Sequence, residues 1–166
     1  MNKMQGKTPE ETKVTMTELV LPNDVNLLRN LKGGRLMHLI DVAAAMAATR
    51  HAESVVATVF LDTLSFKHPI RLGEMVELTA KLVYSGNTSM HIKVTVIGEN
   101  LYTRKRIITN EANLVFVSLD ENERPKKVPP LIPVTEEEKA DYKIAEEKAK
   151  TVRNNKNDNK IFINTR

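Results

Sequence analysis

The chain has 166 residues, 41% of them hydrophobic and 28% charged, which is typical of one globular domain. It contains no cysteine, so disulfides, thiolate metal sites and a cysteine nucleophile are excluded. Its formal charge of +4 would suit an anionic partner, but the positive residues are dispersed and no nucleic-acid motif is visible.

The sequence also argues against a membrane protein and a metalloprotein. No apolar run approaches the roughly 20 residues that span a bilayer, and the first residues lack the apolar core of a secretory signal. We therefore expect no membrane insertion and a cytoplasmic location. The four histidines belong to no metal motif, so we expect surface or capping roles for them and no metal or cofactor: His38, His51, His68 and His91.

The first half of the chain predicts a strand, a loop and a long helix. Residues 12–20 alternate apolar and polar side chains, as in a strand, and residues 21–34 combine Pro, Asn, Asp and Gly, as in a loop. From Gly34 to about His51 the chain is rich in Ala, Leu and Met with no internal Gly or Pro, which favours helix. This helix is apolar on nearly every side, so we expect it to be buried on nearly every side.

Four more strands are predicted, at residues 54–64, 74–84, 89–98 and 106–119. Short connections without helical patterns join them, so the sheet should be largely antiparallel. The fold class is therefore α+β, with one long helix wrapped by a curved antiparallel sheet. Alternation predicts these residues on the buried face: Val76, Leu78, Ala80, Leu82, Tyr84, Met90, Ile92, Val94, Val96, Ile108, Ala112, Leu114 and Phe116.

The core domain should end near residue 134, after a proline-rich segment. Thr135 and Glu138 then form a capping-box pattern, so residues 135–153 are expected to form a charged, exposed helix. Such a helix would either pack on a neighbouring subunit or extend into solvent as an arm. Residues 154–166 are polar and rich in Asn and Lys, and we expect them to be disordered.

Asp41 is the unusual residue of the long helix. Among its neighbours three and four positions away only His38 is polar. An acid in such surroundings has a raised pKa, is hydrogen-bonded or lines a wet cavity. Alternatively, the helix exposes a narrow strip with His38 and Asp41 to solvent, and periodicity alone does not decide between these interpretations.

A glycine pair, Gly33 and Gly34, opens the same helix. Helix N-termini offer unpaired N–H groups and a partial positive charge, and glycine allows a carbonyl or phosphate to come close to the backbone. A simple turn from loop to helix is the alternative interpretation. Combined with a carboxylate two turns further on, the pair favours an oxyanion site next to a base or nucleophile, as acyl transfer requires.

Residues 21–52, LPNDVNLLRNLKGGRLMHLIDVAAAMAATRHA, resemble the signature of the hotdog-fold acyl-CoA thioesterases of the cytosolic acyl-CoA hydrolase type. The later segments DTLSFKHPIRLGEMVEL, GNTSM and VPPLIPVTEEE are also similar, so the resemblance runs from about residue 12 to about residue 150. Arg29 and Lys32 depart from the family, which more often has smaller or aromatic residues there. The signature residues here are Pro22, Asp24, Asn26, Gly33, Gly34, Asp41, Arg50 and His51.

The resemblance implies hydrolysis of acyl-CoA to a fatty acid and CoA. Asp41 would act as general base or nucleophile, Asn26 would orient water or bind the developing charge, and the Gly34 N–H would polarise the carbonyl. Asn26 could instead be only a brace of its loop. Candidate substrate contacts are Gly33, Arg50, Lys67, Thr88 and Ser89.

The resemblance also implies an assembly, because pairs of hotdog units join their sheets and form the active site between them. We therefore expect a homo-oligomer whose minimal active unit is a dimer, and a hexamer built as a trimer of dimers. Two other functions remain open: a noncatalytic acyl-CoA sensor with the same fold, and a nucleic-acid-binding protein suggested by the basic charge.

Overall fold

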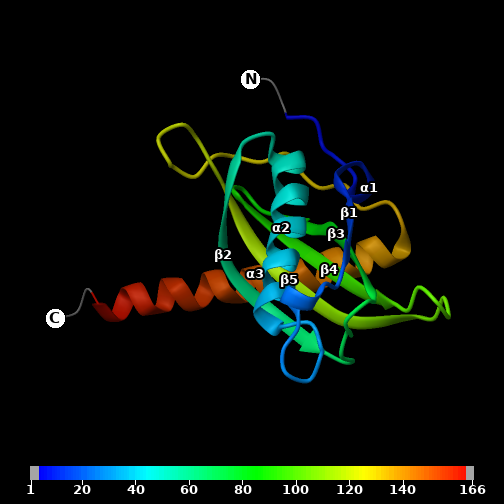
Figure 1. The fold of residues 1–166 in the computed structure, drawn as a ribbon. Helices are drawn as coiled ribbons and strands as arrows, with labels where there is room; N and C mark the ends of the chain where they lie inside the picture. Colours follow the sequence, from blue (N-terminus) through cyan, green and yellow to red (C-terminus); the bar gives the residue numbers. More distant parts are fainter. Residues whose placement is uncertain (1–3, 164–166) are drawn as a thin grey trace.

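The computed structural model describes residues 4–163, with side chains as far as Val152. Five antiparallel strands form one sheet in the order β1-β3-β4-β5-β2. Helix α2 lies across one face of this sheet and α3 across the other (Figure 1). The elements in chain order are α1 (Pro9–Thr12), β1 (Val14–Leu19), the 3-10 turn η1 (Pro22–Asp24), α2 (Gly33–Ala52), β2 (Val55–Phe66), β3 (Met75–Ser85), β4 (Ser89–Glu99), β5 (Arg106–Leu119) and α3 (Glu136–Ile163).

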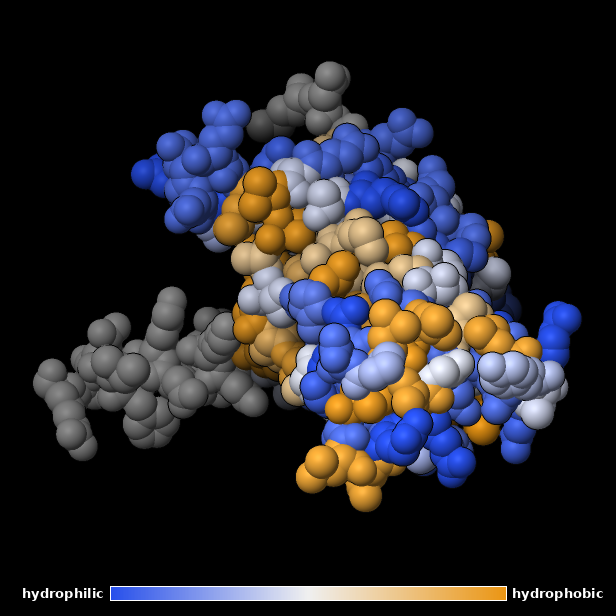
Figure 2. All heavy atoms as spheres, in the orientation of Figure 1, coloured by the Kyte–Doolittle hydropathy of each residue, from blue (hydrophilic) through white to orange (hydrophobic). Residues whose placement is uncertain are grey.

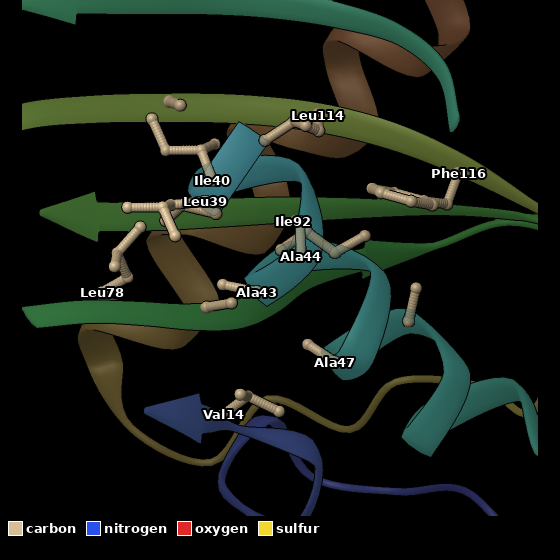
Figure 3. Close-up of a cluster of buried hydrophobic side chains, with 14 of the residues drawn as sticks. Val14, Leu39, Ile40, Ala43, Ala44, Ala47, Leu78, Ile92, Leu114 and Phe116 are labelled. Carbon is tan, nitrogen blue, oxygen red and sulfur yellow. The ribbon is translucent and has the colours of Figure 1, made fainter. Parts of the chain in front are cut away.

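The core lies between α2 and the inner face of the sheet, as the sequence predicted. Helix α2 presents mainly alanine there, so the helix axis comes close to the strands (Figure 3). The expected alternation of β3 and β4 is confirmed over most of their length, because the inward residues from Val76 to Leu82 and from Met90 to Val96 are buried. No helix in the part of the chain that is described is long and apolar enough to cross a membrane.

Two irregularities of the sheet overturn the predicted positions of single residues. The pairing of β3 with β4 shifts between Leu82 and Tyr84, and Tyr84 then packs edge-on against Tyr142 of α3, on the outer face. The pairing of β4 with β5 shifts between Val96 and Ile97, and Ile108 is 46% exposed. A β-bulge adds one residue to a strand and moves the residues after it to the opposite face.

Helix α2 is less buried than its sequence suggests. The sheet covers one side of it, and the opposite side leaves Met37 and Met46 exposed by 44% and 42%. His38 is exposed and Asp41 half-buried on that side. In the single chain the expected burial on nearly every side was therefore wrong, because only one layer of strands covers the helix. The exposed strip is present, and Asp41 is in addition hydrogen-bonded, as the other interpretation expected.

Strand β2 forms one edge of the sheet and is exposed along most of its length. It pairs with β5 on one side only, and no strand of the described chain pairs with its other side. Two β-bulges, between Thr58 and Phe60 and between Leu61 and Thr63, interrupt its pairing. Figure 2 shows hydrophobic surface on the side of the molecule where β2 lies. The exposed apolar residues of β2 are Val55, Val59, Phe60, Leu61 and Phe66.

The first turns of helix α3 pack on the sheet of the same chain and do not extend into solvent as an arm. The predicted capping box is present, because the Glu138 N–H donates to Thr135 Oγ1 and the Thr135 N–H to the Glu138 carboxylate, both at 3.1 Å. Ion pairs then hold the helix to the outer face of the sheet: Lys81–Glu138, Lys93–Asp141 and Lys148–Asp62.

The helix continues to Ile163. The structure thus has helix at residues 154–163, where the sequence predicted disorder; no proline or glycine interrupts this segment. The last three residues of the predicted tail, 164–166, lie outside the described residues.

Candidate active site

The loop before α2 is held by backbone hydrogen bonds at both of its ends. The Lys32 N–H donates to the Asp24 carbonyl at 2.9 Å, and the Leu31 N–H donates to the Ile70 carbonyl at 2.7 Å. Between these points the chain turns outward, and Leu27 is fully exposed. The loop therefore has fixed ends and a protruding tip.

Asn26 lies at the start of that tip and braces it. Its side-chain oxygen accepts hydrogen bonds from the N–H groups of Leu28 and Asn30, at 2.9 and 3.2 Å. The predicted alternative, a brace of the loop, is therefore present. Because two N–H groups occupy the oxygen, the NH2 group is directed away from them and offers two donors. Asn26 can thus brace the loop and still donate to a bound group.

The start of α2 is open. Lys32 occupies the N-cap position without a side-chain hydrogen bond to the helix, so the first N–H groups, those of Gly33 and Gly34, have no partner within the helix. A β-carbon at Gly34 would meet no atom within 4 Å. An oxygen atom could therefore approach these N–H groups.

A hollow of about 350 Å³ lies beside the helix start. The structure brings Asn26, Gly33 and Lys67 together in its wall. Lys67 forms an ion pair with Glu111, and that hydrogen bond is the main cause that lowers the pKa of the Glu111 carboxyl. Asn26, Gly33 and one basic residue thus share a cavity in one chain, while Gly34 is not among the residues that line it.

Asp41 lies further along α2, seven residues after Gly34 and therefore about 10 Å from it. Thr58 of β2 donates its hydroxyl to Asp41 Oδ1 at 2.8 Å. The residues that line the hollow next to Asn26 do not include Asp41. Within one chain the structure therefore separates the predicted acid from the predicted asparagine.

Thr58 is a site residue that the sequence did not single out. Alternation places it on the same face as Val56, Leu64 and Phe66, toward α2, and that signal was available. Its pairing with Asp41 was not available, because it depends on where the helix crosses β2.

The other predicted substrate contacts lie apart from this hollow. Arg50 is in the last turn of α2, and its guanidinium donates to the Lys13 carbonyl. Thr88 and Ser89 lie at the turn between β3 and β4. Ser89 lines a second hollow of about 220 Å³, between the sheet and α3, with Phe60 and Lys148 in its wall.

One histidine, His51, clearly departs from the predicted surface or capping role. His51 is completely buried and its Nε2 lies 2.8 Å from the Pro129 carbonyl oxygen. Burial lowers its pKa, the bond to Pro129 opposes that shift, and the Lys7 charge adds to it. Burial also lowers the pKa of the half-buried His91. Among residues 4–152, whose side chains the structure describes, no three His, Cys, Asp or Glu side chains group as metal ligands would.

The chain shares its sequence and its fold with known thioesterases. Residues 29–103 match the thioesterase superfamily. An uncharacterized acyl-CoA thioester hydrolase of Bacillus subtilis is 36% identical over 163 residues, with 95% of each chain covered. An apo hexameric acyl-CoA thioesterase superposes with a TM-score of 0.87 at 37% identity, covering 92% of this chain and 97% of that one.

An acyl-CoA hydrolase of Staphylococcus aureus, solved with butyryl-CoA, CoA and CoA disulfide, has a TM-score of 0.84 at 30% identity, with 95% and 96% coverage. Structures of that hydrolase include variants in which an aspartate, an asparagine or a threonine is replaced by alanine. From its near full-length similarity to such enzymes, the chain belongs to the thioesterase superfamily and, within it, to the acyl-CoA thioester hydrolases.

Proposed function

We propose that this chain hydrolyses acyl-CoA to a free acid and CoA at a site shared by two copies. Asp41 of one copy would meet Asn26 and the start of α2 of the other. The observation that carries the proposal is the Asp41 carboxylate, held by Thr58 on the exposed strip of α2. It occurs in a chain that is similar over 95% of its length to an acyl-CoA thioester hydrolase.

The roles proposed for the two side chains are compatible with their hydrogen bonds. Asp41 removes a proton from water while the water oxygen attacks the thioester carbonyl carbon. The Asn26 NH2 group and the Gly34 N–H donate to the oxygen that becomes negative. The carbon–sulfur bond then breaks, and Asp41 returns the proton to the CoA sulfur. Water is the only co-reactant, so this reaction needs no metal or cofactor.

A direct attack of Asp41 on the thioester is the second form of this mechanism. It would give an anhydride that water opens in a later step. Thr58 holds one carboxylate oxygen in either form and leaves Oδ2 to face water or substrate. The two forms differ in the isotope pattern after a single turnover in heavy-oxygen water, because only the anhydride route can transfer a solvent oxygen into the Asp41 side chain.

The assembly is proposed from the exposed edge of the sheet. An edge strand of 12 residues that is paired on one side only and carries apolar side chains is a template for pairing with another strand. Joining two copies through β2 would extend the sheet and bring together the α2 strips that carry Met37, Asp41 and Met46. We propose that three such dimers form a hexamer in the cytoplasm, and a hexameric acyl-CoA thioesterase is among the similar structures.

The substrate contacts divide between two regions. Gly33 and Lys67 share the hollow with Asn26, so they are proposed to contact the substrate close to the thioester. Arg50, Thr88 and Ser89 lie away from it, and they remain proposed contacts of the CoA nucleotide. Hydrogen bonds to its ionised phosphates would be charge-assisted at all three, and only Arg50 would add a positive charge.

The proposal is tested by thiol release from a panel of acyl-CoA substrates of increasing chain length. Purified chain should hydrolyse at least one of them. Binding of CoA without turnover would instead identify a noncatalytic sensor, and salt-sensitive binding of DNA without CoA affinity would identify a nucleic-acid-binding protein.

The shared site is tested by mixing two inactive variants, Asn26→Ala and Asp41→Ala, and isolating the mixed dimer. One of its sites has both residues and the other has neither, so about half of the wild-type activity should return. If both residues belonged to one chain's site, every site would lack one of them. The mixed dimer would then be as inactive as its parents.

A further inference from the structure

Arg35 reaches back from the first turn of α2 to the loop that carries Asn26. Its Nε donates to Asp24 Oδ1 at 3.1 Å. The other carboxylate oxygen, Oδ2, accepts the Leu21 N–H at 3.1 Å. The carboxylate thus joins the helix to the beginning of the loop.

The two ends of this contact lie next to the two donors of the proposed oxyanion site. Arg35 follows Gly34 directly, and Asp24 precedes Asn26 by two residues. One more side chain spans the same joint, because Lys32 Nζ donates to the Asn23 carbonyl at 2.8 Å. The distance between the Asn26 NH2 group and the Gly34 N–H therefore depends on how this joint is held.

A purely structural ion pair is the alternative explanation, and its expected size is small. The side chains of Arg35 and Asp24 are 33% and 19% exposed, and partly exposed ion pairs contribute little to stability. Donor placement is a more sensitive property, because a misplacement of about 1 Å can reduce a rate by roughly 100-fold. An effect on turnover without an effect on stability would thus separate the two explanations.

We infer that Arg35 and Asp24 form a positioning pair that sets the Asn26 carboxamide against the N-terminus of α2. The inference rests on the proposed function, since it assigns a role within that site. Neither side chain touches the reacting atoms in this arrangement. Arg35 acts through Asp24, and Asp24 acts through the loop that it begins.

The first test is a set of four variants in the full-length protein. Arg35→Met and Asp24→Asn remove the charge of one partner with little change in size. Each should lower kcat by roughly 10- to 100-fold, with KM and the melting temperature nearly unchanged. The double variant should be no slower than the slower single variant, because both changes break one contact. Glu18→Gln is the matched control, since Glu18 lies 4.0 Å from the Arg35 guanidinium, and it should keep wild-type kcat.

A second test uses mixed dimers, which show the half of the site through which Arg35 acts. Paired with Asp41→Ala, Arg35→Met should regain about half of the wild-type rate, because one site then combines an intact Asn26 loop with an intact Asp41. Paired with Asn26→Ala, it should reach no more than about half of its own residual rate, because both changes affect the same half of the site.

Three results would overturn the positioning pair: independent, multiplying losses in the double variant, an increase of KM alone, or losses of kcat that follow losses of melting temperature. Failure of the proposed function is recognised separately, because the wild-type protein would then hydrolyse no acyl-CoA. Failure of the shared site alone is recognised when the reference mixture of Asn26→Ala with Asp41→Ala shows no recovery, while the kcat of the four variants still decides whether Arg35 and Asp24 act as a pair.

Discussion

The Thr58 hydroxyl and Asp41 Oδ1 lie 2.8 Å apart, and this hydrogen bond joins the edge strand β2 to the exposed side of α2. It fixes the direction of a carboxylate that has no polar neighbour on its own helix except His38. The strand thus orients the acid that the helix carries.

Replacing Asp41 by Asn should remove activity and keep the fold, because the two side chains are nearly isosteric while the amide is not a base. We expect kcat to fall by about 10² to 10⁴. Thiol release measures this, and circular dichroism checks the fold. Turnover close to wild type in Asp41→Asn would exclude the proposed role of this acid.

Replacing Thr58 by Val removes the hydroxyl and preserves the shape. The carboxylate would keep its charge but lose its orientation. We expect kcat to fall roughly 10-fold, because a hydrogen bond to a charged group contributes at least about 1.5 kcal/mol and about 1.4 kcal/mol corresponds to a factor of ten. Thr63→Val is a control on the same strand, since Thr63 contacts Asn113 instead. Equal losses in both variants would point to a general effect on β2.

Replacing Gly34 by Val tests the open helix start. No atom lies within 4 Å of a β-carbon built at this position, so the variant should fold normally. The added side chain should block access to the N–H group and reduce kcat/KM by roughly 100-fold, as the loss of one oxyanion donor does elsewhere. Unimpaired turnover would mean that the glycine pair is only a turn.

Replacing Leu61 by Glu tests the dimer edge. The Leu61 side chain is 40% exposed on β2, and a charge there should oppose pairing with a second β2. We expect a smaller sedimentation coefficient and loss of hydrolysis together. Ile144→Glu on α3, where the side chain is 56% exposed, is the control and should change neither property. An unchanged assembly in Leu61→Glu would contradict pairing through this edge.

Glu138 should stabilise α3 in a pH-dependent way. Burial raises the pKa of its carboxyl, but Lys81 and the N–H groups of Val134 and Thr135 outweigh that effect and lower the pKa to about 2, from 4.5. A lowered carboxyl pKa adds stability that is complete above the pKa of the unfolded state and is lost as the pH falls toward the pKa of the folded state.

The free energy of unfolding should therefore differ between wild type and Glu138→Gln at pH 7. The difference should shrink between about pH 4.5 and pH 2 in urea titrations. A difference that stays constant over this range would contradict the assignment.

The regular helices and strands were predictable from sequence, because burial of one face makes apolar residues recur at the spacing of a strand or a helix. The sequence did not decide whether the strip of α2 with His38 and Asp41 is exposed or buried, and the reason is physical. Alanine and methionine suit a helix that packs on a sheet and one that packs on a second helix, so Met37 and Met46 do not show which applies.

The site was predictable only in part. Asp41 was noticed because it interrupts an apolar helix, and Asn26 through its place in the loop signature. Thr58 and Arg35 became visible only in three dimensions, because each acts on a residue that is 11 to 17 positions away in sequence. The displaced Tyr84 shows the same limit, since nothing in its neighbours marks the bulge before it.

The two bulges of β2 affect how the gene for this protein can change in length. The first adds Val59 and shifts the following side chains to the opposite face, and the second adds Asp62 and restores the original alternation, so Thr58 and Leu64 both face α2. Loss of a single codon between them would leave one shift uncompensated and turn either Thr58 or Phe66 away from the helix. Loss of both extra codons would leave all remaining side chains of β2 on the face of the sheet that they now occupy. Length variation in this strand should therefore occur in steps of two.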